Sequence, residues 1–510
     1  MENSRTYNAT RNIFSGLIKQ IMNIILPFII RTIIIYNLGS EYQGINGLFS
    51  SILQVLSLAD LGFSTAVVFS LYKPISEKDY KIINALMSYL RKIYRIIGVI
   101  VLIIGLSIIP FLKYLINGYI PDNINIYTLY LIYLLNSVIS YYLFAYKSAL
   151  FTSMQREDVV SNVYTITSIF IKITQILLLI FVKNYYAFVL IQPIGTILNN
   201  ILLQVYSKKM FPYIFPEGEI PHHYKSNLSK QVRALFISRV ADVARNSLDN
   251  IIISSFIGLS AVAAYDNYLY IFTGLRGFFL VVVNGMQASI GNSIVEESIE
   301  KNYTDLKKIT LMYMILTSIC TSCLFTLYQP FMNIWMNNSS LILSTECVIC
   351  FCIYFYEINM NNTINLYLNG NGLYWNLRWW YVVESLLNLI LNIILGKILG
   401  IFGVLLATII TILLFNFIPR VGIVFKEYFK INAKEYYCNN IEYFIICVFV
   451  SGISYFISNM ICLDGIIGLI LKGIITLVFS SLLYYIIYKK NKNYMGFFSI
   501  FKRISKRSSK

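Results

Sequence analysis

Thirteen ionisable side chains lie inside long apolar stretches of this 510-residue chain. A charged side chain at the centre of a bilayer costs about 2.5–3.5 kcal/mol on insertion scales, so such residues should face other helices or a water-filled space. They are Lys19, Arg31, Asp60, Lys172, Arg239, Asp242, Arg245, Asp249, Asp266, Arg276, Glu357, Glu384 and Lys472. Lys19, Glu384 and Lys472 lie near the ends of their stretches or can extend to the interface, which favours a structural role for these three.

The stretch 236–257 carries four of these charges. On a helix, its polar side chains gather on one side and its aliphatic side chains on the other. The polar side consists of Arg239, Asp242, Arg245, Asn246, Asp249 and Asn250. The spacings of three and four residues also allow these charges to pair with one another at a helix contact. Four charges and two amides on one face favour the alternative, a face that lines a wet cavity.

The stretches 12–36, 43–72 and 262–294 have polar faces as well, and we expect all four stretches to line a shared central cavity. Arginine stays protonated in any environment, and its planar fork matches two phosphate oxygens. We therefore predict that a pyrophosphate-type anion binds to Arg31, Arg239, Arg245 and Arg276. The predicted charge partners of these arginines, when the anion is absent, are Asp60, Asp242, Asp249 and Asp266.

Glu357 lies near the middle of another apolar stretch, with Asn361 and Asn365 one and two helical turns further on. A carboxyl in such a place can load and unload a proton, or help to bind Na⁺. It can equally be a protonated side chain that is hydrogen-bonded within the helix bundle. The sequence leaves both interpretations open.

Several other patterns carry little weight. Cys320 and Cys323, like Cys347 and Cys350, have the spacing of zinc ligands. Both pairs lie in or beside apolar stretches, where thiols usually pack as small hydrophobic groups. The sequence has no phosphate-binding glycine loop, dinucleotide pattern or nucleophile elbow. We expect no cofactor, no metal and no ATP-driven step within this chain, apart from coupling to H⁺ or Na⁺.

The elements that must position these residues are membrane-spanning helices. The chain is 57% hydrophobic and 13% charged, with a mean hydropathy of +0.66. Its apolar residues come in blocks of about 20, the length at which an α-helix crosses a bilayer. We predict an all-α polytopic membrane protein with about 14 transmembrane helices and no cleavable signal peptide. The predicted spans are 12–36, 43–72, 94–117, 124–147, 159–182, 187–206, 236–257, 262–294, 309–330, 345–368, 378–396, 399–419, 441–462 and 465–488.

The net charge of +17 reports orientation and not nucleic-acid binding. When residues at span edges are counted with the adjoining loop, 31 of the 41 lysines and arginines lie in the termini and in the loops from even to odd spans. Three, Lys113, Lys183 and Lys397, fall on the opposite side. The positive-inside rule then places both termini in the cytoplasm of a bacterial inner membrane.

A long hydrophilic segment divides the chain. We predict an N-terminal lobe at 1–206, a cytoplasmic linker at 207–235, a C-terminal lobe at 236–430, and two further spans with a basic tail at 431–510. Two short internal sequence repeats support a duplicated six-helix unit. The turn at 38–46 recurs at 257–265, and 183–188 resembles 397–402, at offsets of 219 and 214 residues.

The sequence resembles bacterial polysaccharide-precursor flippases of the Wzx (O-antigen and capsule exporter) type, within the multidrug, oligosaccharidyl-lipid and polysaccharide exporter superfamily. The resemblance is carried by Leu38-Gly39-Ser40-Glu41-Tyr42-Gln43-Gly44, by Leu58-Ala59-Asp60-Leu61-Gly62, and by residues 388–408. It implies two pseudo-symmetric, MATE-like six-helix lobes with alternating access. It also implies ion-gradient-coupled transfer of an undecaprenyl-pyrophosphate-linked oligosaccharide to the outer leaflet. Partners would then be that lipid-linked cargo, membrane lipids, a polysaccharide polymerase and other assembly proteins.

Three alternatives remain. A drug/cation antiporter of the same superfamily would favour an acidic cavity, whereas this chain has at least as many arginines as aspartates in its polar faces. A lipid II flippase differs too little to be separated by sequence. An oligosaccharide polymerase or ligase would need a large external loop with catalytic residues, and every predicted external loop is short. We therefore expect a transporter and not an enzyme.

Overall fold

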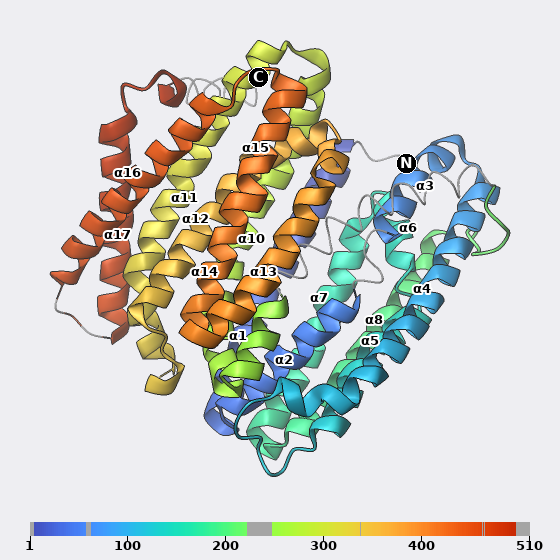
Figure 1. The fold of residues 1–510 in the computed structure, drawn as a ribbon. Coiled ribbons are helices and arrows are strands. Elements are labelled where there is room, and N and C mark those ends of the chain that lie inside the picture. The colour runs from blue at the N-terminus through green and yellow to red at the C-terminus, as the bar shows by residue number, and fades with distance from the viewer. Residues whose placement is uncertain are drawn as a thin grey trace. The chain divides into compact units, whose positions relative to one another are not determined.

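The computed structural model describes residues 5–57, 63–221, 247–336, 338–461, 463 and 465–495 (Figure 1). These residues form helices joined by short turns, and none of them lies in a strand. A backbone that crosses hydrocarbon must satisfy its own hydrogen bonds, which a helix does within one segment. The predicted all-α class is confirmed.

The chain divides into two compact units, Met1–Ala263 and Ala264–Lys510. The helices of the first unit are α1 (Arg5–Asn37), α2 (Ser40–Leu56), α3 (Phe63–Glu77), α4 (Tyr80–Ile108), η2 (Ile109–Leu115), α5 (Ile126–Tyr142), α6 (Lys147–Ser153), α7 (Glu157–Leu177), η3 (Leu178–Val182) and α8 (Tyr185–Met210). Residues 247–256 are also helical. The predicted lobe and linker boundaries stay a prediction, because 222–246 lies outside the described residues.

The second unit begins within α10 (Leu259–Glu296). Its remaining helices are α11 (Ile299–Met336), η4 (Ser339–Leu341), α12 (Thr345–Gly370), η5 (Leu373–Leu377), α13 (Arg378–Leu399), α14 (Ile401–Thr411), η6 (Ile412–Phe417), α15 (Ile418–Val424), η7 (Phe425–Phe429), α16 (Lys434–Asn459) and α17 (Gly465–Tyr488). The stretch from α14 to η7 is one span in which α-helix gives way to π-helix at η6 and again at η7.

Ten helices within the described residues are long and apolar enough to cross a membrane. An eleventh span is made by α5 and α6 if this pair, bent by 54°, crosses as one. Together they match the predicted first, third to sixth and ninth to fourteenth spans, so the chain is a multi-pass membrane protein. Of the other three, 43–72 falls on α2 and α3, 236–257 lies largely outside the described residues, and 262–294 falls within α10. The count of fourteen stays a prediction.

The outer faces of these helices are apolar. Ile103 on α4 is 61% exposed and Ile466 on α17 is 64% exposed, among many aliphatic side chains in the same position. A water-soluble protein rarely leaves so large an apolar surface uncovered. Trp375 and Trp379 are also exposed, and the Arg378 guanidinium lies 4.6 Å from the Trp375 ring centroid. This is the arrangement expected of an anchor at a membrane interface.

The two turns of the first predicted repeat each contain a glycine of positive φ. Gly39, before α2, has φ +122°, and Gly258, before α10, has φ +132°, values that favour glycine. The turns also touch: the hydroxyl oxygens of Ser40 and Ser260 lie 2.9 Å apart, and the Ser260 hydroxyl donates to Glu41 Oε1 at 3.0 Å.

The segment 247–260 packs directly on α2. A Cβ added to Gly44 would lie 2.0 Å from the carbonyl oxygen of Leu259, so only glycine allows this approach. Further along, the Asn250 amide donates to Ser51 Oγ at 3.0 Å. The backbone amide of Asn117, in the loop after η2, donates to the Ser254 carbonyl at 2.9 Å. These contacts fix the segment within the first unit.

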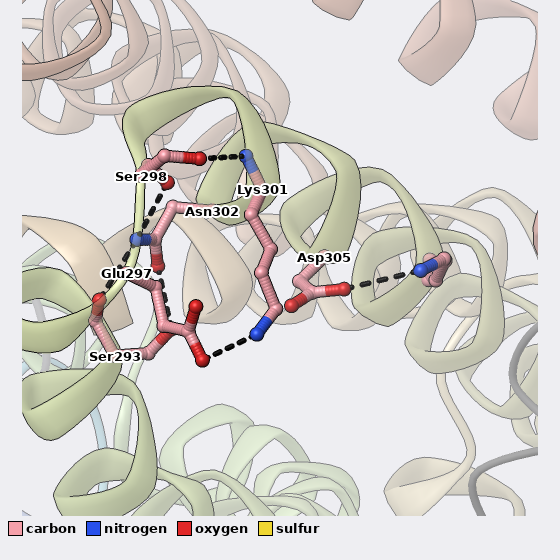
Figure 2. A network of polar contacts seen from close by, with 7 residues as sticks. Ser293, Glu297, Ser298, Lys301, Asn302 and Asp305 are labelled. Atoms are coloured by element: carbon pink, nitrogen blue, oxygen red, sulfur yellow. Dashed lines mark hydrogen bonds and ion pairs between the residues drawn. The ribbon is translucent and has the colours of Figure 1, made fainter.

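The turn between α10 and α11 is held by one buried amide (Figure 2). The Asn302 side chain donates to the carbonyls of Ser293 and Ser298 at 2.9 and 3.2 Å, and accepts from Ser293 Oγ at 2.9 Å. Lys301 forms an ion pair with Glu297 across the same turn. Because the last carbonyls of a helix have no partner within it, this asparagine stabilises the end of α10.

Candidate functional site

A polar cavity of about 480 Å³ lies within the first unit. Small-molecule sites in proteins typically occupy about 300–1,000 Å³. The walls come from α1, α2, α5, α7 and α8. The lining residues are Pro27, Ile30, Arg31, Gln43, Asn46, Ser50, Asn136, Ser140, Tyr164, Thr167, Ser168, Ile171, Lys172, Phe188, Gln192, Gly195, Thr196, Asn199 and Asn200.

The charged groups of this cavity are both cations. Arg31 comes from α1 and Lys172 from α7, two helices that pack along each other. Both side chains are half-buried, and the described lining contains no carboxylate. Two cations in one partly dehydrated space repel each other, and an anion between them removes that cost. The cavity therefore suits a negatively charged group.

The side-chain amide of Gln43 is also part of the cavity wall. Its side chain is fully buried, and neither Oε1 nor Nε2 has a hydrogen-bond partner among the described residues. A buried polar group without a partner costs about 1–3 kcal/mol. Such an amide is ready to bond a group that enters the cavity, as donor through Nε2 and acceptor through Oε1.

Other polar side chains of the wall are held in place by neighbours. Asn46 Oδ1 accepts from the Tyr133 hydroxyl at 2.7 Å. Asn136 Oδ1 accepts from the Thr196 hydroxyl at 2.7 Å, and Asn200 Nδ2 donates to the Thr196 carbonyl at 2.8 Å. These bonds orient the amides and hydroxyls without consuming all their capacity. The wall is thus pre-organised for a ligand rich in hydroxyl groups.

The structure describes some of the predicted site residues and not others. Arg31 lines the cavity. Asp249, also in the first unit, is buried, and in the second unit Asp266 is buried and Arg276 is half-buried, both on α10. The remaining four lie outside the described residues: Asp60, Arg239, Asp242 and Arg245. Their predicted roles, and the shared central cavity, stay predictions.

Lys172 and Gln43 were not among the site residues predicted from the sequence. Lys172 was recognised as a charge inside a span, but nothing in the sequence pairs α7 with α1. Gln43 stands on the polar face of 43–72, and only its burial without a partner sets it apart.

In the second unit, Arg276 lies close enough to the Tyr313 hydroxyl to act on it electrostatically. The Tyr313 hydroxyl donates to Asn359 Oδ1 at 3.0 Å and accepts from Asn362 Nδ2 at 2.8 Å. The arginine on α10 therefore lies near a buried polar network formed by residues of α11 and α12.

Glu357 is 6% exposed on α12, and its Oε2 atom has no hydrogen-bond partner among the described residues. The next turn carries Asn361, whose Nδ2 donates to the Glu357 backbone carbonyl at 3.2 Å. Asn361 Oδ1 accepts from the Arg420 guanidinium at 3.4 Å. Arg420 is 8% exposed on α15 and was not predicted as a site residue, because the predicted span ended at 419.

A second carboxyl is buried nearby in the fold. Glu384 on α13 is 2% exposed, and its Oε2 atom accepts from Asn416 Nδ2 at 2.7 Å. Asn416 stands on the π-helical stretch η6, which packs against α12 and α13. Glu384 thus faces a helix contact and does not extend to the interface. Inserted π-helical residues often mark functional sites.

The cysteines pack among apolar groups. Cys320 and Cys323 line an apolar pocket with residues of α10 and α17, and Cys347 and Cys350 are buried on α12. Where the structure describes side chains, no group of three or more histidines, cysteines or carboxylates could hold a metal ion.

A match to a known protein family covers more than half of the chain. The family described as "Polysaccharide biosynthesis protein" matches residues 9–286. The chain belongs to this family. It is a flippase family of the multidrug, oligosaccharidyl-lipid and polysaccharide exporter superfamily, as the sequence motifs indicated. No curated protein matches the chain.

Solved structures of the same superfamily share the fold. The lipid II flippase MurJ, in an inward closed conformation, matches with a TM-score of 0.68 and 16% identity, over 94% of this chain and 99% of MurJ. An inward-facing MATE multidrug transporter matches with a TM-score of 0.60 and 13% identity, over 78% and 94%. An outward-facing one gives 0.55 and 12%, over 84% and 98%. At these identities the likeness shows the fold alone, and it confirms the MATE-like class.

Proposed function

We propose that this polysaccharide biosynthesis protein transfers an undecaprenyl-pyrophosphate-linked oligosaccharide from the cytoplasmic to the outer leaflet of a bacterial inner membrane. Both termini lie in the cytoplasm in this proposal. The observation that carries it is the cavity of the first unit, where Arg31, Lys172 and Gln43 converge and the described lining holds two cations and no carboxylate. A flippase must bind the charged headgroup of its lipid, and this cavity has the matching charge. A polysaccharide polymerase and other assembly proteins are the expected partners.

The cavity residues can bind different parts of the proposed cargo. The Arg31 guanidinium can hold two phosphate oxygens at once, and the Lys172 ammonium adds a second positive charge. Gln43 supplies a neutral donor and acceptor to the same anion or to the first sugar. The surrounding asparagines, serines and threonines suit sugar hydroxyls, because each can both donate and accept. The aspartates predicted as charge partners, Asp60, Asp242, Asp249 and Asp266, would compete for the arginines during release.

We assign ion coupling to Glu357. A buried carboxyl is much less costly when it is neutral, so loading a proton or Na⁺ onto it changes the stability of its helix contacts. The partnerless Oε2 atom and the Asn361–Arg420 pair on the adjoining turn support this role. The alternating-access cycle would then run on the ion gradient, without a cofactor.

The cavity charge and the family match disfavour two of the alternative functions and leave one as a second candidate. A drug/cation antiporter should line its cavity with carboxylates, whereas the described lining holds two cations. An oligosaccharide polymerase or ligase is disfavoured because the chain belongs to a flippase family. A lipid II flippase stays the second candidate, because lipid II carries the same polyprenyl pyrophosphate and the fold matches MurJ.

The test is a translocation assay in proteoliposomes with defined lipid-linked sugars. We expect Arg31→Gln and Lys172→Met to lower the initial rate at least about tenfold, since each removes a charge-assisted contact of about 1.5–3 kcal/mol. Lys113→Gln is the matched control, because Lys113 is an exposed cation of the same unit outside the cavity. Wild-type rates in both cavity variants would contradict the proposal.

The same assay separates the candidate cargoes. An undecaprenyl-pyrophosphate oligosaccharide and lipid II are compared at equal concentration, with a proton gradient, a sodium gradient or neither. Faster transfer of the oligosaccharide supports the first candidate, and faster transfer of lipid II supports the second. Transfer of neither, by protein that is folded and correctly inserted, would contradict both.

A further inference from the structure

A buried lysine lies away from the cavity, at the start of α6. Lys147 is 3% exposed, although lysine is among the residues that folded proteins bury least. It does not line the cavity of the first unit. Its ammonium lies 5.6 Å from the ring centroid of Tyr146, which is itself buried. Burying such a charge needs a compensating group.

The side chains around Lys147 are also cationic. The charges that act on its ammonium are those of Arg91 on α4 and Lys208 on α8. Arg91 and Arg95, one turn apart on α4, also lie close enough to the Tyr146 hydroxyl for their charges to act on it. Three helices thus direct positive charge to one place.

Arg91 is held in position by the backbone. Its Nη2 atom donates to the carbonyl of Pro216 at 3.1 Å, in the loop that follows α8. The same loop is tied to α4 by a second bond, from the Phe215 amide to Asn84 Oδ1 at 3.0 Å. The guanidinium is therefore anchored on one side and keeps further N–H groups for another acceptor.

Among the described residues, no carboxylate forms an ion pair with this cluster of Arg91, Arg95, Lys147 and Lys208. The acids at the start of α7 have other partners. Asp158 is paired with Arg156 at 3.0 Å, and Glu157 accepts from the Thr152 hydroxyl at 2.6 Å.

We propose that Arg91, Arg95, Lys147 and Lys208 form a binding site for a phosphate-type anion, distinct from the transport cavity. An anchored guanidinium beside a buried ammonium is a recurrent way to hold phosphate oxygens. The site stands on the side of α4, α6 and α8 that adjoins the loops predicted to be cytoplasmic. The phosphate comes from an anionic phospholipid or from a free phosphate compound. The site does not depend on which cargo the protein carries.

A lysine that only marks the cytoplasmic side of the membrane is expected to be exposed, unlike Lys147. Lys92, next to Arg91 on α4, is exposed in this way. It therefore provides a matched control for Lys147. Lys208 is exposed too but acts on Lys147, so it tests the cluster without disturbing a buried position.

The experiment follows the melting temperature of the full-length protein in a neutral detergent. Short-chain phosphatidylglycerol, short-chain phosphatidylcholine and inorganic pyrophosphate are added in separate titrations. Phosphatidylglycerol should raise the melting temperature of the wild type and of Lys92→Met. In Lys147→Met and Lys208→Gln the concentration for half the effect should rise about tenfold, the loss of one charge-assisted contact. Without anion, Lys147→Met should melt no lower than the wild type, because an uncompensated charge is gone.

The arms distinguish the source of the phosphate. A response to phosphatidylglycerol but not to pyrophosphate identifies a lipid headgroup, and a response to both identifies the phosphate group itself. Lys147→Arg keeps the charge and should keep the response. Equal responses in the wild type, Lys147→Met and Lys208→Gln, or a response to phosphatidylcholine as large as that to phosphatidylglycerol, would overturn the proposal. If Lys147→Met does not fold, Lys208→Gln and Lys147→Arg decide it.

Discussion

At the scale of single residues, function depends on polar groups whose hydrogen-bonding capacity is not consumed by the fold. Gln43 and Glu357 are both more than 90% buried, and each has a side-chain atom with no partner in the described structure. Packing alone would select an apolar side chain at either position, because an unsatisfied buried group destabilises the protein. We infer that the cost is retained because a ligand or an ion uses these atoms.

Gln43→Met tests this trade-off directly. The change removes two unsatisfied polar atoms and keeps the volume, so we expect an unchanged or higher melting temperature together with slower translocation. Gln175→Met is the control: Gln175 is equally buried, and although its Oε1 has no partner among the described residues, its Nε2 donates to the Phe188 carbonyl at 2.9 Å, a bond that methionine would lose. That variant should melt at a lower temperature. A Gln43→Met protein with lower stability and normal transport would refute the assignment.

Glu357→Gln should uncouple transport from the ion gradient. Glutamine has the same shape but cannot gain or lose a proton and binds Na⁺ weakly, so we expect similar translocation rates with and without a gradient. The measurement is the initial rate in proteoliposomes under each gradient. Glu346→Gln, at an exposed position at the start of the same helix, should keep the wild-type gradient dependence. If the translocation rate of Glu357→Gln still depends on the ion gradient, Glu357 has a structural role and not a coupling role.

At the scale of helices, close packing depends on a few glycines. Gly44 allows α2 to approach the backbone of Leu259, and Gly403 allows α14 to approach the backbone of Leu395 on α13. In each case an added Cβ would lie 2.0 Å from a carbonyl oxygen, which a backbone cannot easily give up. Both contacts occur within motifs that the sequence singled out, so part of that motif signal reflects helix packing.

Gly44→Ala should therefore destabilise the protein. Overpacking against a backbone atom costs about 1–3 kcal/mol, more than the roughly 1 kcal/mol that alanine gains over glycine in a helix. The melting temperature of the purified protein measures the effect. Gly16→Ala is the control, because no atom lies within 4 Å of a Cβ built there, and it should be neutral or stabilising. Equal melting temperatures for the two variants would contradict the close approach of α2 to Leu259.

At the scale of the whole molecule, charge sets orientation. The lysines and arginines concentrate on one side of the predicted spans, which the positive-inside rule assigns to the cytoplasm. The helix α8, Tyr185–Met210, connects a predicted external turn at Lys183 to the predicted cytoplasmic linker.

Reporter fusions on either side of α8 test this orientation. Alkaline phosphatase fused after Asn184 should be active, because that point is predicted to be external, and the same enzyme fused after Met210 or Lys510 should be inactive. A fluorescent protein that folds only in the cytoplasm should give the reverse pattern. Active phosphatase after Lys510 would contradict a cytoplasmic C-terminus.

The class of the fold, the positions of most spans and the family could all be predicted from the sequence. These follow from local properties: blocks of apolar residues long enough to cross a bilayer, and short motifs at turns such as Gly39. The resemblance carried by those motifs agreed with the family match. The charges inside the spans were also visible, because any ionisable residue there is conspicuous.

Which polar residues meet could not be predicted without the three-dimensional structure. Arg31 and Lys172 are 141 positions apart, and nothing local reveals that α1 packs along α7. The burial of Gln43, Arg420 and Lys147 was likewise hidden, because exposure depends on neighbours from distant helices. Helical periodicity gives the face on which a residue stands, but not the helix that covers that face. The physical reason is that burial and hydrogen-bond satisfaction are properties of contacts between helices, whereas hydropathy belongs to each segment alone.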